Sequence, residues 1–421
     1  MDLFKEAFDI AQQIYFKPEL GFKEKNTHQL IENYIKKYST DICIEKFSTT
    51  GIKCYLNSQK KKKLKVALIG ELDGVYAPLH MYADKKTGAA HNCGHYSQVA
   101  ILLYILSYYI KYKLYEKLDY ALCFIFLPAE EYLDIEYRKE LREKKEIIHL
   151  CGKAEAMRLG IFDDIDAVIG IHSMGGNFSE RSIEINCNLA GFLYKNYNFL
   201  GKPSHAGFAP ASGINAYSMS TLFNVGLGLF RQQIDDKYLV RINSIIQSPN
   251  MTINIIPQNV KIDCDIRAHS VEYLIELSKN LDNIADGTAL SLGGKVEKST
   301  EIGYLPFKQD EYLSTFVKKT FDNFEEIKVC KENNPISAAG DIGDLSFMRP
   351  CIQVGYSGFK GTIHGNDFIH DDVEYIFSIF PKFMIKVLKN LSGKLDKNLL
   401  YKKTYEEYIT TIDLLRRINE K

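Results

Sequence analysis

The sequence predicts an α/β protein whose main domain holds a mixed, mostly parallel sheet between helices, with an α+β domain inserted into it. Three short apolar runs, at residues 66–70, 120–127 and 167–171, indicate buried strands, and helical patterns lie between them. The segment 187–302 changes character, because strand-like alternation surrounds two longer helical stretches. With 421 residues, the chain is also too long for one ordinary core.

Helical periodicity appears at both ends of the chain and after the first apolar strand. The spacing of apolar residues predicts a helix over 3–15 and a second one that starts near Thr27, the expected N-cap. The almost unbroken apolar run at 99–106 indicates a buried helix. Closing helices are expected at 373–388 and 405–415.

The middle of the chain predicts a separate unit of roughly 110 residues, within the usual size of a domain. We place its bounds at 187–302, between the two parts of the main domain at 1–186 and 303–421. This insert has no Cys/His/Glu cluster of its own. Its expected elements are a strand at 190–200, a helix at 214–230, paired strands at 251–256 and 260–266, a helix at 271–285 and a strand at 295–301.

The composition narrows the class of protein. Lys and Arg together number 53, as do Asp and Glu, so the formal net charge is zero and no basic footprint for nucleic acid or acidic membranes exists. Nine cysteines without a CxxC pair are typical of free thiols in a reducing compartment. The N-terminus lacks a signal-peptide apolar region, and the most apolar stretch falls short of the roughly 20 residues that span a bilayer. We expect a soluble cytoplasmic protein without nucleic-acid or membrane partners.

The stretch His-Asn-Cys-Gly-His at 91–95 carries the first candidate metal ligands. Two imidazoles flank one thiol, and the glycine permits a tight turn immediately before the buried helix. Cys93 and His95 are both good ligands for zinc-like or manganese-like ions. Taken alone, such a pair also fits ordinary packing, so the hypothesis depends on further ligands downstream.

Further candidates follow the ends of the apolar strands, which in an open α/β sheet is the edge where ligands bind. Asp73 is either a loop acid that caps a turn or a carboxylate that orients a metal ligand. Glu130 and Glu131 are costly after so apolar a strand unless a cation or a proton accompanies each. One can bind a metal and the other can move a proton, whereas acids at a helix N-terminus are the alternative. His172 ends the third strand, and His364 lies in a later glycine-flanked segment.

In this order the motifs resemble those of the M20 metallopeptidase family, in its branch of aminoacylase-like and aminobenzoyl-glutamate-hydrolase-like amidohydrolases. The resemblance covers nearly the whole chain. The matching segments are Pro-Glu-Leu-Gly-Phe at 18–22 with Thr27, Gly-Glu-Leu-Asp at 70–73, the motif at 91–95, Pro-Ala-Glu-Glu at 128–131, Gly-Ile-His at 170–172, residues 201–206, Asn-Ile-Ile-Pro at 254–257 with Arg267, Gly-Asp-Ile-Gly-Asp at 340–344, and His364.

The resemblance implies a site with two divalent ions, zinc or manganese, with cobalt or nickel also possible. Cys93 would bridge the ions as thiolate, and the other ligands would be His95, Glu131, His172 and His364. Glu130 would be the general base for attack of a metal-bound water on an amide carbonyl, with Asp73 beside the site as a second catalytic residue. The substrate would be a small amide of an amino acid.

The resemblance also gives the insert a role as a lid and dimerisation domain. His205, Asn254 and Arg267 would bind the substrate, and the lid would form a homodimer. Departures occur at Tyr96, where the branch usually has Asp or Asn, and at Glu71, where many members have Asp. Two alternatives to the amidohydrolase stay open: a dipeptidase or carboxypeptidase of the same fold, and a metal-free binding or regulatory protein on that fold.

Overall fold

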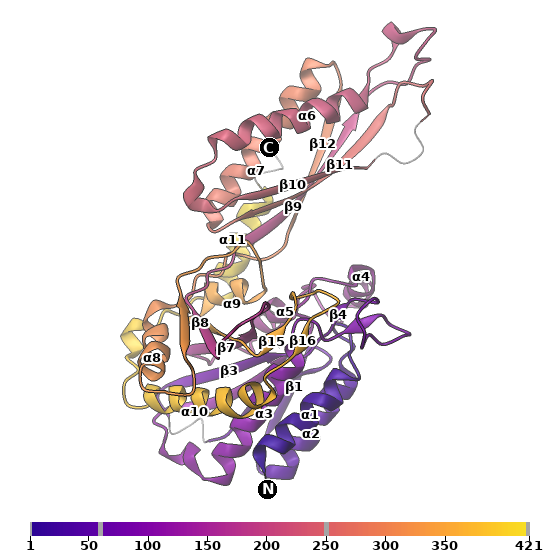
Figure 1. Ribbon diagram of the computed structural model, residues 1–421. Coiled ribbons are helices and arrows are strands. Elements are labelled where there is room, and N and C mark those ends of the chain that lie inside the picture. The colour runs from indigo at the N-terminus through magenta and orange to yellow at the C-terminus, as the bar shows by residue number, and fades with distance from the viewer. Residues whose placement is uncertain (1, 58–61, 248–251, 418–421) are drawn as a thin grey trace. The chain divides into compact units, whose positions relative to one another are not determined.

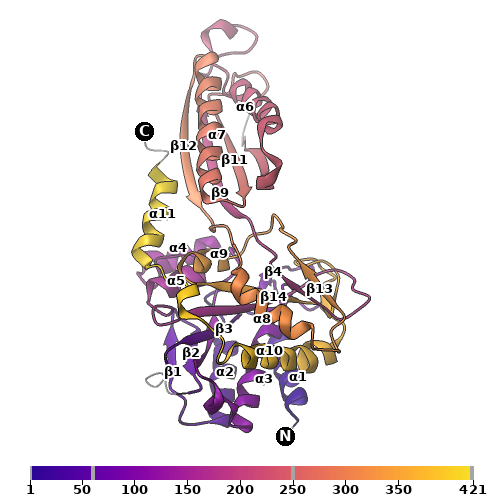
Figure 2. The same cartoon turned by 90° about the vertical axis from the view of Figure 1, so that its left-hand side faces the viewer.

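The computed structural model describes residues 2–57, 62–247 and 252–417. The chain forms two compact units (Figures 1 and 2). The first comprises Met1–Cys187, Lys308–Asn334 and Asp344–Tyr405, and the second comprises Asn188–Phe307, Pro335–Gly343 and Glu406–Lys421. The second unit therefore includes two segments that lie outside the predicted insert.

A mixed sheet forms the centre of the first unit and confirms the predicted fold class. Within the described residues it has eight strands, in which β6, β3, β7 and β14 are parallel neighbours. The carboxyl ends of these strands therefore lie at one edge. In spatial order the strands are β1 (Ile44–Phe47), β2 (Gly51–Tyr55), β6 (Ala121–Leu127), β3 (Lys65–Glu71), β7 (Ala167–Ser173), β14 (Cys351–Tyr356), β8 (Ser182–Ile185) and β13 (Val329–Glu332).

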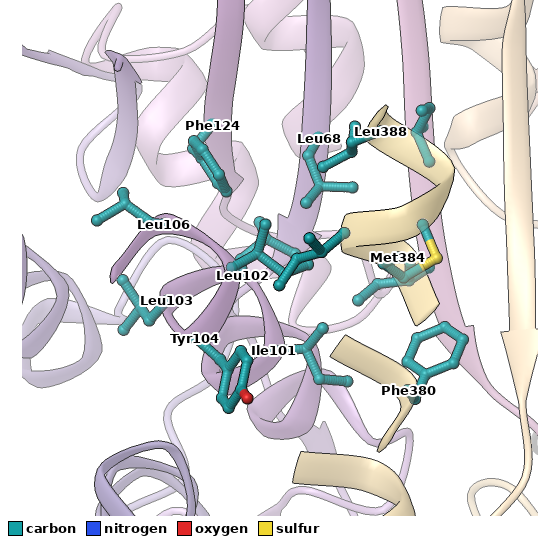
Figure 3. Packing of buried hydrophobic residues seen from close by; sticks show 14 of the residues in the cluster. Leu68, Ile101, Leu102, Leu103, Tyr104, Leu106, Phe124, Phe380, Met384 and Leu388 are labelled. Atoms are coloured by element: carbon teal, nitrogen blue, oxygen red, sulfur yellow. The ribbon is translucent and has the colours of Figure 1, made fainter. Parts of the chain in front are cut away.

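Helices cover this sheet, and the predicted buried helix is α3 (His95–Lys111). Figure 3 shows Leu102 of α3 among Leu68 and Phe124 of the sheet and Met384 of α10. The other helices of the chain outside the insert are α1 (Leu3–Tyr15), α2 (Lys25–Tyr38), α4 (Ile135–Glu143), α5 (Gly152–Arg158), α8 (Glu311–Phe321), α9 (Ile342–Met348), α10 (Phe380–Leu391), which a π-helical turn at Tyr375–Ile379 precedes, and α11 (Tyr405–Arg417). Two-stranded ribbons pair β4 (Val75–Tyr76) with β5 (Ala89–Ala90) and β15 (Phe359–Lys360) with β16 (Ile369–His370).

The expected N-cap of α2 was wrong. The helix begins at Lys25, and Thr27 lies within its first turn. The carboxylate of Glu19 accepts hydrogen bonds from the backbone N–H groups of Asn26 and Thr27, both at 3.0 Å. Because a side chain outside the helix satisfies these N–H groups, the helix does not need Thr27 as its cap.

The second unit contains an antiparallel sheet on which the helices α6 (Ala216–Phe230) and α7 (Val271–Ser291) pack, also against each other (Figure 1). It also includes α11 from Glu406 onward. Its strands are, in spatial order, β10 (Arg241–Gln247), β11 (Asn259–Ala268), β9 (Gly191–Leu200) and β12 (Lys295–Ile302). Across the described part of the chain, no helix combines the length and apolarity needed to cross a bilayer.

The predicted strand at 251–256 was wrong. Met251 lies outside the described residues, residues 253–254 form a turn that a single bridge at Ile255 follows, and β10 is the hairpin partner of β11. The N–H of Ala206 donates to the carbonyl of Asn254 at 2.9 Å, so this turn pairs with the segment around His205 instead. Pro257, which has no N–H for a strand ladder, follows directly.

Candidate functional site

The candidate ligands of the first unit converge at the carboxyl-terminal edge of its sheet. Asp73 lies two residues beyond β3, the pair Glu130 and Glu131 follows β6, and His172 lies within β7. His364 lies in the loop between β15 and β16, and its N–H donates to the carbonyl of Asn92 at 2.8 Å. His364 has a φ of 64°, an uncommon backbone conformation for this residue type that often marks a functional position.

A tight turn brings Cys93 to β7. Gly94 adopts a φ of 88°, and a Cβ at this position would lie 2.6 Å from Ser173 Oγ. Ser173 Oγ donates a hydrogen bond to the carbonyl of Cys93 at 2.6 Å. Glycine is therefore required between Cys93 and His95, both for its conformation and for the close approach to β7.

Two groups of candidate ligands share Cys93. One consists of Cys93, His95 and His172, the other of Cys93, Glu131 and His364, and within each group the potential ligand atoms lie within 4.8 Å of one another. Cys93 Sγ is 3.5 Å from His172 Nε2, and His364 Nε2 is 2.9 Å from Glu131 Oε1. Thiolate, imidazole and carboxylate together suit a transition metal or zinc.

The electrostatics of these groups fit a cation. Burial, and then the negative charge of Glu131, raise the pKa of the Cys93 thiol well above its ordinary value. Such a thiol keeps its proton unless a cation is close, and a metal ion bound to the sulfur would displace that proton. Burial also lowers the pKa of His172, which keeps the imidazole neutral with a lone pair for coordination.

Asp73 connects both groups. Nδ1 of His95 is 2.9 Å from the carbonyl of Asp73 and 3.2 Å from its Oδ1, while Oδ2 accepts a hydrogen bond from the N–H of Glu131 at 3.0 Å. His95 Nε2 is buried and makes no well-directed hydrogen bond to a described residue, although Glu71 Oε2 lies 3.1 Å from it. The residues therefore fit a metal, because Asp73 holds one ring nitrogen of His95 and leaves the other for coordination.

The potential ligand atoms of a third group, Glu71, His95 and Glu130, also lie within 4.8 Å of one another. We do not count Glu71 as a ligand, because Lys153 Nζ lies 2.6 Å from its Oε1 and Gln98 Nε2 donates to its Oε2 at 2.8 Å. Burial alone raises the pKa of Glu71, but the charge interactions with Lys153, His95 and His172 together outweigh burial and lower the pKa below its ordinary value. Glu130 Oε2 lies 3.9 Å from His95 Nε2, beside the two groups that share Cys93.

The predicted substrate-binding residues His205, Asn254 and Arg267 all belong to the second unit, and their contact with substrate stays a prediction. The segments of His205 and Asn254 are neighbours there, and Nδ1 of His205 accepts from the N–H groups of Gly207 and Phe208. Arg267 Nε donates to Asp265 at 3.0 Å, and its Nη1 donates to the carbonyl of Ser337 at 3.2 Å.

Three further buried residues were given no separate role from the sequence, although two of them lie in or beside the motif at 91–95. His91 is buried but belongs to none of the three groups, and Tyr96, the departure noted above, is buried with its hydroxyl 2.8 Å from His370 Nδ1. Lys153 is a fully buried lysine in the short helix α5, between glycine and alanine. A lysine in so apolar a stretch is a signal for a buried carboxylate partner, although the partner itself cannot be read from the sequence.

Comparison with known proteins identifies the family. A model of the peptidase family M20/M25/M40 matches residues 67–376. The chain is 25% identical to a hippurate hydrolase of Campylobacter jejuni, covering 92% of this chain and 98% of the relative, and 24% identical to an N-acetyldiaminopimelate deacetylase of Lactobacillus acidophilus, covering 76% and 82%. A dinuclear metal-binding peptidase of the M20 family from Bacillus subtilis has the same fold, with a TM-score of 0.74 and 15% identity over 93% of this chain and 99% of that one. This chain therefore belongs to the peptidase family M20/M25/M40 and is a metallohydrolase of amide bonds.

Proposed function

We propose that this protein is a two-metal amidohydrolase that cleaves the amide bond between an acyl group and an amino acid. The observation that carries the proposal is the position of Cys93 in two candidate ligand groups at once. One thiolate shared by two groups is the arrangement expected of a bridging ligand between two ions. The dinuclear metal-binding neighbour of the same fold is consistent with this interpretation.

In the proposed site, His95 and His172 would hold one ion with Cys93, and Glu131 and His364 would hold the other. When bound, zinc, manganese, cobalt or nickel would polarise the amide carbonyl and make water more acidic. Asp73 orients His95 through Nδ1 and fixes the backbone of Glu131. Asp73 thus fixes the positions of one ligand from each of the two groups relative to each other.

Glu130 is the proposed general base. Its carboxylate lies beside the two ligand groups that share Cys93, 3.9 Å from His95 Nε2, and is partly open to solvent, whereas Glu131 is buried. Glu130 would accept the proton of the attacking water and then donate it to the departing nitrogen. One carboxyl group can perform both steps in turn because its proton returns to the leaving group.

The second unit is proposed to act as a lid and dimerisation domain, with His205, Asn254 and Arg267 as substrate-binding residues. Supporting a dimer, α6 carries apolar side chains on its outer side as well as toward the core. The exposed ones are Tyr217, Leu222, Val225 and Leu229. An apolar face on a surface helix commonly forms a contact between subunits.

The names of two relatives bear on the substrate. Hippurate and N-acetyldiaminopimelate both carry an acyl group on the nitrogen of an amino acid. We therefore favour an N-acyl amino acid over a dipeptide. All nine cysteines are free, which favours a reducing compartment such as the cytoplasm.

The test combines a substrate screen with two matched variants. Purified protein, loaded with each metal in turn, is assayed on N-acyl amino acids and on dipeptides, and preference for dipeptides would favour a peptidase of the same fold. Glu130→Gln should keep its metal content and lose about 10²–10⁴-fold in turnover, the usual effect of removing a general base. Glu131→Gln should instead lose metal. Swapped phenotypes would reverse the two roles, and near-parental turnover of Glu130→Gln would contradict the mechanism.

A further inference from the structure

The backbone around Glu130 is held on both sides by buried groups. Ala129, the residue before Glu130, has a φ of 52°, which is rare for an alanine. Its N–H donates to Glu24 Oε1 at 2.8 Å, and its carbonyl accepts from the N–H of Gly152 at 3.0 Å. A Cβ at Gly152 would lie 1.6 Å from the carbonyl oxygen of Pro128, so α5 presses directly against this turn.

The residue after Glu130 is held just as firmly. The N–H of Glu131 donates to Asp73, and its carbonyl accepts from the buried guanidinium of Arg138. The side chain of Glu130 is therefore attached to a short backbone segment whose neighbouring residues are both held by hydrogen bonds. Asp73 and Arg138 form hydrogen bonds with the backbone of Glu131. Glu24 is the acidic side chain that accepts from the N–H of the left-handed residue Ala129.

The side chain of Glu24 does not cap the helix that it precedes. It occupies the N-cap position of α2 but makes no capping hydrogen bond with its side chain, and Glu19 accepts from the first N–H groups instead. Its carboxyl is completely buried, and burial, followed by the negative charge of Asp73, raises its pKa. Burying a carboxyl is unfavourable unless its hydrogen bonds are satisfied. Here Thr50 Oγ1 donates to Oε2 at 2.7 Å, and Ala129 occupies Oε1.

We propose that Glu24 is a positioning residue for Glu130. Held by Thr50, its carboxyl fixes the N–H of Ala129 in the left-handed turn and so directs the next side chain toward the ligand groups. The inference rests on the proposed role of Glu130 as the general base. Among the described residues, Glu24 makes no hydrogen bond or ion pair with a candidate ligand, so its effect on catalysis is indirect.

The principal variants are Glu24→Ala and Glu24→Gln. Alanine removes both hydrogen bonds, whereas glutamine keeps an oxygen for Ala129 N–H and can donate its amide to Thr50. We expect Glu24→Ala to lower kcat by about 10–100-fold, because a shift of about 1 Å in a catalytic group can cost that much. KM and metal content should stay near parental, and Glu24→Gln should recover most of kcat.

Glu32→Ala is the matched control. Glu32 is a nearly buried glutamate on the same helix, and it pairs with Lys36, Lys46 and, at 3.7 Å, His28 rather than with the turn at Ala129. It should lower thermal stability without lowering kcat per folded, metal-loaded molecule. Parental kcat in Glu24→Ala, or an equal loss of kcat in Glu24→Ala, Glu24→Gln and Glu32→Ala, would overturn the proposal.

Hydrogen exchange provides a readout that does not depend on turnover. The amide of Ala129 should exchange faster in Glu24→Ala than in the parent, and Glu24→Gln should restore its protection; unchanged exchange would overturn the proposal. If Glu24→Ala does not fold, Thr50→Val takes its place. We expect this variant to show a smaller loss of kcat and a partial loss of protection at the amide of Ala129. Parental kcat together with parental protection would refute the proposal. If Glu130→Gln stays active, the base assignment fails, and exchange at Ala129 alone decides whether Glu24 holds the turn.

Discussion

The buried ion pair of Lys153 and Glu71 should be one of the most sensitive supports of the site, and Lys153→Met tests this expectation. Lys153 Nζ lies 2.6 Å from Glu71 Oε1, with the side chains only 1% and 7% exposed. Methionine keeps the length and the apolar stem of lysine but removes its charge. The variant leaves a carboxylate buried next to His95, whose Nε2 is 3.1 Å from Glu71 Oε2.

Removing one partner of a buried pair usually destabilises a protein by about 3–5 kcal/mol. We expect about 3 kcal/mol, the lower end of that range, because Gln98 still donates to Glu71 in the variant. Since proteins are commonly stable by about 5–15 kcal/mol, this is a large fraction of the total. Glu71→Gln combined with Lys153→Met should recover much of the loss, because no unpaired charge remains.

The loss should depend on pH. Burial alone raises the pKa of Glu71, but Lys153 and His95 outweigh it and hold the pKa in the folded protein below the ordinary 4.5. A lowered carboxyl pKa contributes stability that is present above the unfolded-state pKa and is lost as pH falls through the folded-state pKa. The difference between parent and Lys153→Met should therefore be full at neutral pH and shrink below pH 4.5.

Urea unfolding of metal-free protein at several pH values measures this difference. Lys36→Met is the matched control, because Lys36 pairs with Glu32 at 2.7 Å but is 58% exposed. Exposed pairs contribute about 0–1 kcal/mol, so this variant should unfold close to the parent. A Lys153→Met protein as stable as the parent at neutral pH, or a double variant less stable than the single one, would refute the reasoning.

Two further predictions concern the metals and the dimer. Cys93→Ser should weaken retention of both ions, because both ligand groups share the thiol. Metal analysis after dialysis measures this retention. Parental metal content together with parental turnover would show that Cys93 does not bridge two ions. Leu229→Glu, at a 63% exposed position on α6, should convert a dimer to a monomer in sedimentation analysis, while Leu79→Glu, at an 80% exposed position in the first unit, should not. A parent that sediments as a monomer at micromolar concentration would remove the basis for this contact.

Much of the first unit could be predicted because its central strands are buried on both faces. The apolar runs at 66–70, 120–127 and 167–171 became β3, β6 and β7. Strand β13 escaped prediction because its four residues are half-buried or exposed and carry no such signal. In the second unit, β10 was missed because the turn around Pro257 suggested a hairpin with the segment immediately before it.

The proximity of the candidate ligands could also be anticipated, because parallel strands end at one edge and their terminal residues must meet there. The supports could not be anticipated in the same way. Lys153 is 82 positions from Glu71, and Glu24 is 105 positions from Ala129. Neither pair has a periodic or local pattern, so only the folded chain joins its members. The roles of the candidate ligands stay predictions until metal is measured.

Ligands and supports of this site should fail in different ways. Cys93 and Glu131 present their atoms to a prospective ion, so their replacement should change metal content first and turnover as a consequence. Glu24 holds a backbone N–H beside Glu130, so its replacement should change turnover while metal content stays the same. Lys153 neutralises a buried charge, so its replacement should appear first in stability and its pH dependence. Measuring metal content, kcat and unfolding on the same set of variants therefore assigns each residue to its role, even before the natural substrate is known.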